Sequence, residues 1–106
     1  MSYEIYETVT WKANTDVSDE AMIEAATTFS HTIRSLPGFL HQALYKNGEQ
    51  DWVSVYYWAT ETDAKHSNDA VANDPHFLQL LSLIQSESIV ITLYTPVQQK
   101  GQLAFT

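Results

Sequence analysis

The chain has 106 residues, which is enough for one domain with its own hydrophobic core and too few for two. Thirteen acidic residues against five basic ones give a formal net charge of -8, so the basic patch that nucleic acid or an anionic membrane surface would require is missing. The absence of cysteine excludes disulfides, thiol chemistry and metal–thiolate sites. The first residues contain no long apolar run, so we expect no signal peptide, no membrane span and a cytoplasmic location.

The first two predicted elements are a strand and an amphipathic helix. Residues Tyr3 to Trp11 alternate in two sets, as in a β-strand, with Glu7 in the same set as Ile5 and Val9. Ser18 is a favourable helix N-cap, and acidic residues follow it where the helix dipole favours negative charge. Apolar residues then recur every three or four positions, which predicts a helix over about residues 19–35.

A long β-hairpin follows this helix. Leu36-Pro37-Gly38 is a helix-stopping sequence, and Phe39 to Lys46 then alternates as a strand. Asn47-Gly48 predicts a type I′ turn, in which both central residues need positive φ. The stretch from Trp52 to Trp58 is rich in β-branched and aromatic residues and forms the second strand.

The last third of the chain predicts a broken helix and a final strand. Thr60 or Thr62 can cap a helix with thin apolar content, and Asp74-Pro75 then provides a new N-cap and first helical position. We expect this second piece, which is strongly apolar, to run over residues 75–85. A strand over residues 88–95 ends at Pro96, and residues 96–106 form a C-terminal tail.

This element order predicts a ferredoxin-like α+β fold, βαββαβ, in one domain covering residues 1–106 with its core at about 3–95. Its four-stranded antiparallel sheet would carry helices on one face only. One assignment turns Val53, Val55, Tyr57, Ile89, Ile91 and Leu93 toward the helices and leaves Tyr45, Trp52, Tyr56, Trp58 and Tyr94 outward. Either assignment leaves large aromatic residues outward, so we predict a homodimer that packs sheet on sheet.

Four short motifs suggest a family. They are Pro37-Gly38-Phe39 before a strand, Tyr57-Trp58 at a strand end, Thr60 to Ala64, and Pro75-His76-Phe77. In this order they resemble the antibiotic biosynthesis monooxygenase group of the dimeric α+β barrel superfamily, over about residues 3–95. The resemblance implies a homodimer and a range of activities that includes cofactor-independent oxygenation of aromatic and quinol substrates and haem degradation.

The haem-degrading branch is matched poorly. That branch typically has an asparagine on the first strand and a tryptophan and a histidine on the second helix. This chain has Tyr6, Glu7 or Thr8 at the first position, Ser67 or Asn68 at the second and Leu81 at the third. His66 or His76 would then have to provide the axial imidazole.

The candidate catalytic residues are Glu7 and His66, and the candidate substrate-binding residues are Tyr57, Trp58 and His76. A carboxylate on the apolar face of a strand is costly unless it is paired or catalytic, and a neutral imidazole can accept a phenolic proton near neutral pH. These residues can instead have purely structural roles: Glu7 at the edge of the sheet, the histidines in solvent and the aromatic residues packed in the core of the dimer. No histidine or carboxylate pair has metal-ligand spacing, so we expect no metal and no cofactor.

The leading hypothesis from sequence is a small dimeric enzyme that deprotonates an aromatic or quinol-type substrate and lets the carbanion react directly with oxygen. The alternative is a non-catalytic dimeric protein of the same fold that binds a small hydrophobic molecule. The absence of a tight acid–base pair in the sequence favours the alternative.

Overall fold

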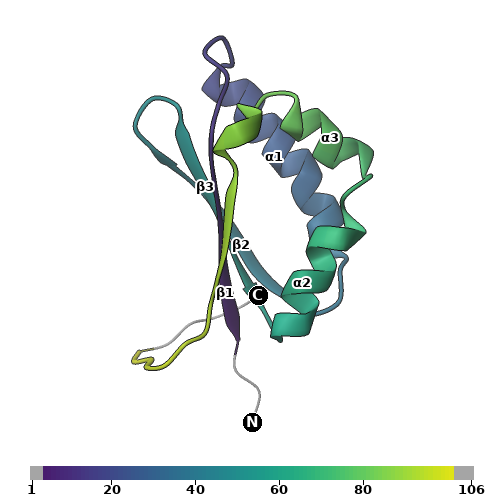
Figure 1. Cartoon of the computed structure of the whole chain (residues 1–106), viewed down its shortest axis with the longest axis vertical. Helices are drawn as coiled ribbons and strands as arrows, with labels where there is room; N and C mark the ends of the chain where they lie inside the picture. Colours follow the sequence, from purple (N-terminus) through teal and green to yellow (C-terminus); the bar gives the residue numbers. More distant parts are fainter. Residues whose placement is uncertain (1–3, 102–106) are drawn as a thin grey trace.

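Four antiparallel strands form one sheet, and the helices lie on one of its faces in the computed structural model, which describes residues 4–101 (Figure 1). The strands are β1 (Ile5–Lys12), β2 (Phe39–Asn47), β3 (Asp51–Trp58) and β4 (Val90–Tyr94), in the spatial order β2-β3-β1-β4. The helices are α1 (Asp19–Arg34), α2 (Glu61–Ala70) and α3 (Pro75–Leu81), followed by a 3-10 turn, Ser86–Ser88. The ferredoxin-like α+β fold is therefore confirmed. Tyr3 and residues 102–106 of the predicted tail lie outside the described residues.

The helix starts predicted from sequence are confirmed by their capping bonds. The Ser18 hydroxyl accepts a hydrogen bond from the backbone N–H of Ala21 at 3.1 Å. Thr60, rather than Thr62, caps α2 by accepting from Asp63 N–H at 3.1 Å. Asp74 caps α3 by accepting from two backbone N–H groups, each at 3.1 Å. Each such cap contributes about 1 kcal/mol, so these residues fix where the helices begin.

The hairpin between β2 and β3 is confirmed, but its predicted type I′ turn is wrong. Asn47 remains in the strand and pairs with Asp51, so the loop has three residues, 48–50, instead of two. Gly48 has a φ of +84°, and among residues 4–101 only glycines have a positive φ. Because strand pairing continues one residue further than expected, only the glycine needs the left-handed conformation.

The α3 helix ends at Leu81, four residues before the predicted end at Gln85. Ile84 instead forms an isolated antiparallel bridge with Ala13, and the N–H of Gln85 donates to the Lys12 carbonyl at 2.9 Å. The final strand likewise starts at Val90, because residues 86–88 form the 3-10 turn. The end of β1 therefore captures residues that local sequence pattern assigned to a longer helix.

The register of the sheet decides which side chains face the helices. Ile5 pairs with Trp58, Glu7 with Tyr56 and Trp11 with Trp52, so these side chains share one face. The assignment considered from sequence is therefore reversed on β3, where Trp52, Tyr56 and Trp58 are 5%, 7% and 0% exposed. On β4 it holds, because Leu93 pairs with Glu7, and Tyr94 pairs with Tyr6 on the outer face. Burial of the three large aromatic rings of Trp52, Tyr56 and Trp58 stabilises this orientation of β3 more than burial of Val53, Val55 and Tyr57 would stabilise the opposite one.

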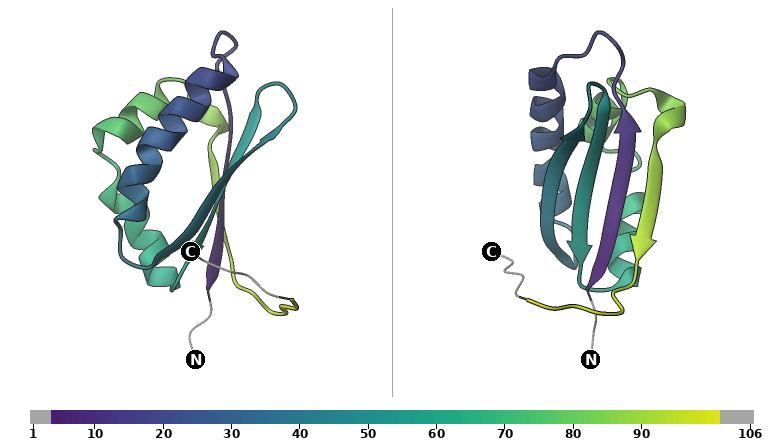
Figure 2. Two further views of the ribbon diagram at one scale, coloured as in Figure 1. Left: turned by 180° about the vertical axis from the view of Figure 1, so that it is seen from behind. Right: turned by 90° about the vertical axis from the view of Figure 1, so that its left-hand side faces the viewer.

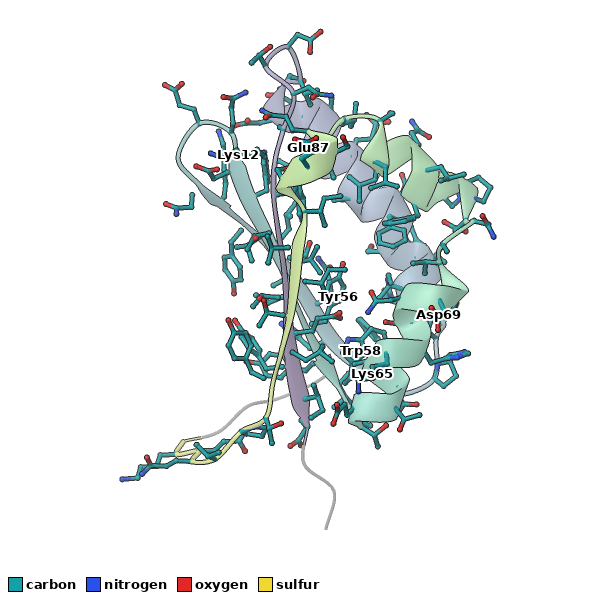
Figure 3. The ribbon with its side chains drawn as sticks, viewed as in Figure 1. Lys12, Tyr56, Trp58, Lys65, Asp69 and Glu87 are labelled. Carbon is teal, nitrogen blue, oxygen red and sulfur yellow. The ribbon has the colours of Figure 1, made fainter. Side chains whose placement is uncertain are left out.

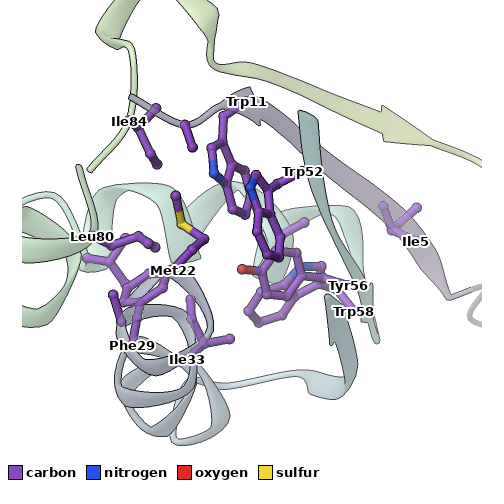
Figure 4. Packing of buried hydrophobic residues seen from close by; sticks show 14 residues of the cluster. Ile5, Trp11, Met22, Phe29, Ile33, Trp52, Tyr56, Trp58, Leu80 and Ile84 are labelled. Carbon is purple, nitrogen blue, oxygen red and sulfur yellow. The ribbon is translucent and has the colours of Figure 1, made fainter. Parts of the chain in front are cut away.

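The helices cover one face of the sheet (Figure 2), and the hydrophobic core lies between these two layers (Figure 4). Helix α1 packs against β2 and α3, whereas α2 packs against β1 and β3. The edge strand β4 packs mainly on β1, and its helix-facing Ile91 is 49% exposed. One side of the helix-facing sheet surface is therefore left open along β4. No helix among residues 4–101 has the length and apolar character needed to cross a membrane.

Candidate functional site

Glu7 is a buried carboxylate at the centre of the sheet. It lies on β1, which pairs with β3 on one side and β4 on the other, and it is only 2% exposed. The indole N–H of Trp58 donates to Glu7 Oε1 at 2.8 Å, and the Asn68 amide of α2 donates to Oε2 at 3.4 Å. The ion pairs found among residues 4–101 lie elsewhere. Neutral donors, rather than a cation, therefore hold this carboxylate.

The protonation of Glu7 is set by two opposing effects. Burial raises the pKa of the carboxyl group, because desolvation disfavours the charged form. The hydrogen bonds from Trp58 and Asn68 lower the pKa and only partly offset burial. A carboxylate with a raised pKa is a stronger base than an exposed glutamate, as expected for a proton acceptor that works near neutral pH.

A cavity of about 150 Å³ lies beside Glu7, between the sheet and the helices. The sheet contributes Glu7, Trp11 and Tyr56, and the facing helix wall is mostly apolar, with Phe29 and Leu80 among its residues. Two lining residues, Asn68 on α2 and Ile91 on β4, are exposed. The cavity therefore approaches solvent between α2 and the uncovered side of β4.

Tyr56 places a phenol next to the carboxylate. Its pKa is raised to about 12, first by burial and further by the charge of Glu7, while a hydrogen bond with Ser54 acts in the opposite direction. The Tyr56 ring also stacks on Trp58, with ring centroids 6.2 Å apart. Tyr56 is therefore protonated at any working pH and can offer a hydroxyl to a bound molecule.

Trp11 contributes a polar atom that no other residue in the described part of the chain satisfies. Its side chain lines the cavity and is 4% exposed. Its indole Nε1 is the one buried side-chain nitrogen or oxygen among residues 4–101 that has no hydrogen-bond partner. The nitrogen lies on the side of the indole turned away from Trp52 (Figure 4).

The structure brings together two of the five candidate residues. Glu7 lines the cavity, and the Trp58 indole N–H donates a hydrogen bond to its carboxylate. The side chains of Trp58 and Tyr56 lie between the sheet and α2 (Figure 3). Tyr57 lies on the opposite, outer face of the sheet, with its ring 5.2 Å from that of Tyr6. His66 is exposed on α2, and His76 is exposed at the start of α3 beside a different depression.

The remaining polar residues of the site, Trp11, Tyr56 and Asn68, were not among the candidate residues selected from sequence. Trp11 alternates in phase with Glu7 on the same strand, so the sequence did contain a signal for it. Tyr56 could be recognised only once the register with Glu7 was known. Asn68 lies on a helix of thin apolar content, which gives no indication of the face that it presents. Among residues 4–101, no group of three or more His, Cys, Asp and Glu side chains is placed to hold a metal ion.

The chain has a small ferredoxin-like α+β fold that is similar to solved structures of antibiotic biosynthesis monooxygenase-like proteins, which confirms the resemblance inferred from sequence at the level of the fold. A mutant of SnoaB, a cofactor-independent oxygenase from Streptomyces nogalater, superposes with a TM-score of 0.78 and 14% identity, covering 93% of this chain and 98% of that one. A putative antibiotic biosynthesis monooxygenase from Nitrosomonas europaea gives a TM-score of 0.71 and 17% identity, covering 95% and 97%.

A dimeric ferredoxin-like protein of unknown function from Thermobifida fusca gives a TM-score of 0.70 and 13% identity, covering 91% of this chain and 93% of that one. No family model and no curated protein matches the sequence. At these identities the likeness establishes the fold and leaves the activity to be argued from the site.

Proposed function

We propose that this chain is a cofactor-independent monooxygenase-like enzyme that acts on a small aromatic or quinol-type substrate. The observation that carries the proposal is the buried Glu7 carboxylate, whose pKa is raised by burial and which faces an apolar cavity. The fold is shared with SnoaB, which is described as a cofactor-independent oxygenase. A single aromatic ring suits the cavity, because dry apolar cavities of about 150 Å³ accept a molecule the size of benzene.

In this proposal Glu7 accepts a proton from an acidic C–H group of the bound substrate. The resulting carbanion transfers its electrons to O₂ and forms a carbon–oxygen bond. For an enolisable ketone, the O–O bond then breaks, so that one oxygen atom remains on the substrate as a carbonyl and the other leaves as water with the two hydrogens of the original CH₂ group. A quinol instead gives a hydroxyl proton to Glu7, and its reaction with one O₂ yields a hydroxyquinone and one water. The apolar walls exclude water, which keeps the carboxylate basic and prevents early reprotonation of the carbanion.

Oxygen consumption tests this proposal directly. Purified protein would be supplied with a panel of quinols and enolisable aromatic ketones, and saturable oxygen uptake above the spontaneous rate is expected. Glu7→Gln keeps the shape but cannot accept the proton, so we expect a loss of about 100-fold or more, as for removal of a general base. Glu20→Gln, the same change at an exposed position of α1, is the matched control. Uptake that Glu7→Gln leaves unchanged would refute the proposal.

The roles predicted for His66, His76 and Tyr57 remain part of the proposal and need separate variants. None of the three lines the cavity, since the histidines are exposed and Tyr57 belongs to the outer sheet face. His66→Ala that loses activity as completely as Glu7→Gln would place the reaction near the exposed surface of α2. Full activity in all three variants would restrict the site to the cavity.

The alternative function, non-catalytic binding of a small hydrophobic molecule, is favoured by one observation. No histidine within residues 4–101 lines the cavity, so Glu7 has no imidazole partner there for proton transfer. Saturable binding of aromatic molecules without any oxygen uptake would support this alternative. Haem binding gains no support from the cavity, because His66 and His76, which would have to ligate the iron, do not line it.

The proposed enzyme would act as a homodimer, formed through the outer face of the sheet. Tyr45, Val90 and Tyr94 are 57%, 56% and 49% exposed on that face, and Tyr6 packs against Tyr57 and Tyr94 at its centre. Exposed aromatic groups of this kind are common at protein interfaces. The Thermobifida fusca protein of the same fold is described as dimeric. Light scattering coupled to gel filtration would give twice the chain mass if the proposal is right.

A further inference from the structure

Glu7 is a buried carboxylate without a cation beside it. It is 2% exposed, and its donors are the neutral indole of Trp58 at 2.8 Å and the neutral amide of Asn68 at 3.4 Å. The ion pairs found among residues 4–101 involve other carboxylates. Buried charges in proteins are as a rule paired with an opposite charge. The partner that this carboxylate lacks within the described chain is therefore a positive charge.

The cavity next to Glu7 contains no positive charge of its own. Glu7 and Tyr56 are its titratable lining residues, and within residues 4–101 no Lys, Arg or His lines it. The carboxylate accepts two hydrogen bonds but has about four lone-pair sites, so it can accept further bonds. A ligand in the cavity can therefore bond to Glu7 while Trp58 stays in place.

The walls of the cavity suit the body of an organic cation. Trp11 and Tyr56 line it from the sheet, and Phe29 faces them from α1 (Figure 4). Phe77 of α3 also lines it, with its ring centroid 5.3 Å from that of Phe29. Aromatic ring faces attract cations, and apolar walls accept a hydrocarbon body. An anionic ligand is disfavoured both by Glu7 and by the net charge of -8.

Polar lining groups lie in one row across the sheet. Tyr56 pairs with Glu7 of β1 on one side and with Gln42 of β2 on the other, and all three residues line the cavity. The phenol and the amide each have an oxygen atom that can accept a hydrogen bond. A primary ammonium group has three N–H donors, so a carboxylate and neutral oxygen acceptors in one row match its bonding needs.

The protonation states of the two partners also agree. An alkylamine has a pKa of about 10, far above the ordinary range of a carboxyl group, so it keeps its proton beside Glu7. The cation in turn favours the charged form of the carboxyl group, against the effect of burial. Folding has already removed water from Glu7, so binding requires only the amine to lose its hydration.

We propose that the cavity binds a small organic cation, a primary amine attached to a single ring, whose ammonium group pairs with the Glu7 carboxylate. This inference goes beyond the proposed enzyme, because it uses the same cavity but requires no oxygen and no proton transfer to Glu7. A carboxylate that is paired with an ammonium group cannot serve as a base. Such an amine would therefore inhibit the proposed reaction.

A pair of probes isolates the charge of the ligand. Benzylamine and benzyl alcohol share a ring and nearly the same length, but only benzylamine is a cation at neutral pH. Both can donate a hydrogen bond to Glu7. Because hydrogen bonds between charged groups are stronger than those with a neutral partner, NMR titration of the wild type should show benzylamine binding at least about fivefold more tightly. A smaller preference would overturn the proposal.

Glu7→Gln keeps the shape of the side chain and removes its charge. The preference for benzylamine should fall to about twofold or less in this variant. Glu20→Gln removes the same net charge from an exposed position of α1 and should leave the preference unchanged. A preference that persists in Glu7→Gln, or that is lost in Glu20→Gln, would overturn the proposal, because the net charge of the surface would then attract the amine.

A second readout needs no variant that might fail to fold. The carboxyl-carbon resonance of Glu7 in isotope-labelled wild type reports the pKa of that group. Saturating benzylamine should lower this pKa, because a neighbouring cation favours the charged carboxylate, whereas benzyl alcohol brings no charge. Tyr56, the other titratable residue that lines the cavity, has a pKa of about 12 and stays protonated in this titration. A Glu7 pKa that benzylamine does not lower would overturn the proposal.

The results separate this inference from the proposed enzyme. A benzylamine preference that depends on Glu7, without any oxygen uptake, would support the inference and remove the enzyme. Oxygen uptake that depends on Glu7 and that saturating benzylamine does not inhibit would overturn the inference and leave the enzyme.

Discussion

Replacing Trp58 by phenylalanine tests the hydrogen bond on which the candidate site depends. The bond joins the Trp58 indole N–H to Glu7 Oε1 at 2.8 Å, between side chains that are 0% and 2% exposed. A hydrogen bond to a charged group contributes about 1.5–3 kcal/mol. Exchange of an indole for a phenyl ring in a packed core adds about 1–2 kcal/mol. We therefore expect Trp58→Phe to lower the free energy of unfolding by about 2.5–5 kcal/mol.

A double-mutant cycle separates the hydrogen bond from the packing loss. Glu7→Met removes the acceptor and preserves the length of the side chain, and the double variant with Trp58→Phe completes the cycle. Urea unfolding would be followed by circular dichroism at a mildly alkaline pH, because removal of a tryptophan changes the fluorescence. The coupling energy should be about 1.5–3 kcal/mol. A coupling below about 0.5 kcal/mol would show that the two side chains merely lie next to each other.

The same variant should change the proton affinity of Glu7. The Trp58 hydrogen bond lowers the pKa of the carboxyl group against the larger effect of burial, so its loss should raise that pKa further. The pH dependence of oxygen uptake should then shift to higher pH, because deprotonated Glu7 is the base in the proposed reaction. Carboxyl-carbon NMR of Glu7 in wild type and Trp58→Phe measures this directly. A pKa that falls in the variant would refute the role assigned to the indole.

Three further predictions concern stability and assembly. Burial raises the pKa of Glu7, so the stability that this group contributes is present below its unfolded-state pKa and is lost as the pH rises through its folded-state pKa. The urea midpoint of Glu7→Gln should therefore increase relative to that of the wild type as the pH rises. A midpoint that decreases relative to the wild type would contradict this. Gly38→Ala, with a φ of +80° and a Cβ that would lie 2.6 Å from Asp63 Cβ, should cost about 2–4 kcal/mol, against about 1–2 kcal/mol for Gly48→Ala at +84°. Equal losses in these two glycine variants would argue against the Asp63 clash. Tyr94→Arg should halve the mass measured by light scattering, and an unchanged mass would exclude the outer sheet face as the dimer contact.

The fold could be read from the sequence because its signals are local. Ser18 and Asp74 cap helices in the structure as they do in isolated sequence motifs. The errors arose where distant parts of the chain compete with local preference. Pairing of Asn47 with Asp51 moved the turn, and the bridge from Ala13 to Ile84 shortened the last helix. Neither contact has a signature in a short window of sequence.

The candidate site was only partly predictable for a related reason. Glu7 stood out because a carboxylate in an apolar alternation conflicts with the pattern around it. His66 was also selected as a candidate, but it is exposed in the structure. Helix α2 buries only Ala64 and Ser67 within its own length, so its sequence does not define an inner face. The choice between the two faces of β3 was undetermined, because both contain large aromatic residues. Only the register with β1 decides between Tyr56 and Tyr57.

The neighbours Tyr6 and Glu7 point to opposite faces of the sheet from β1, which pairs with β3 on one side and β4 on the other. Tyr6 contacts the outer aromatic residues Tyr57 and Tyr94, and Glu7 contacts Trp58 and Asn68 in the interior. A single layer of backbone thus separates two surfaces that have no side chain in common. Under natural selection, the residues of the inner surface can therefore change while those of the outer surface stay the same. An insertion or deletion of one residue in β1 would exchange the two sets of side chains, so this strand should tolerate substitutions far better than changes in length.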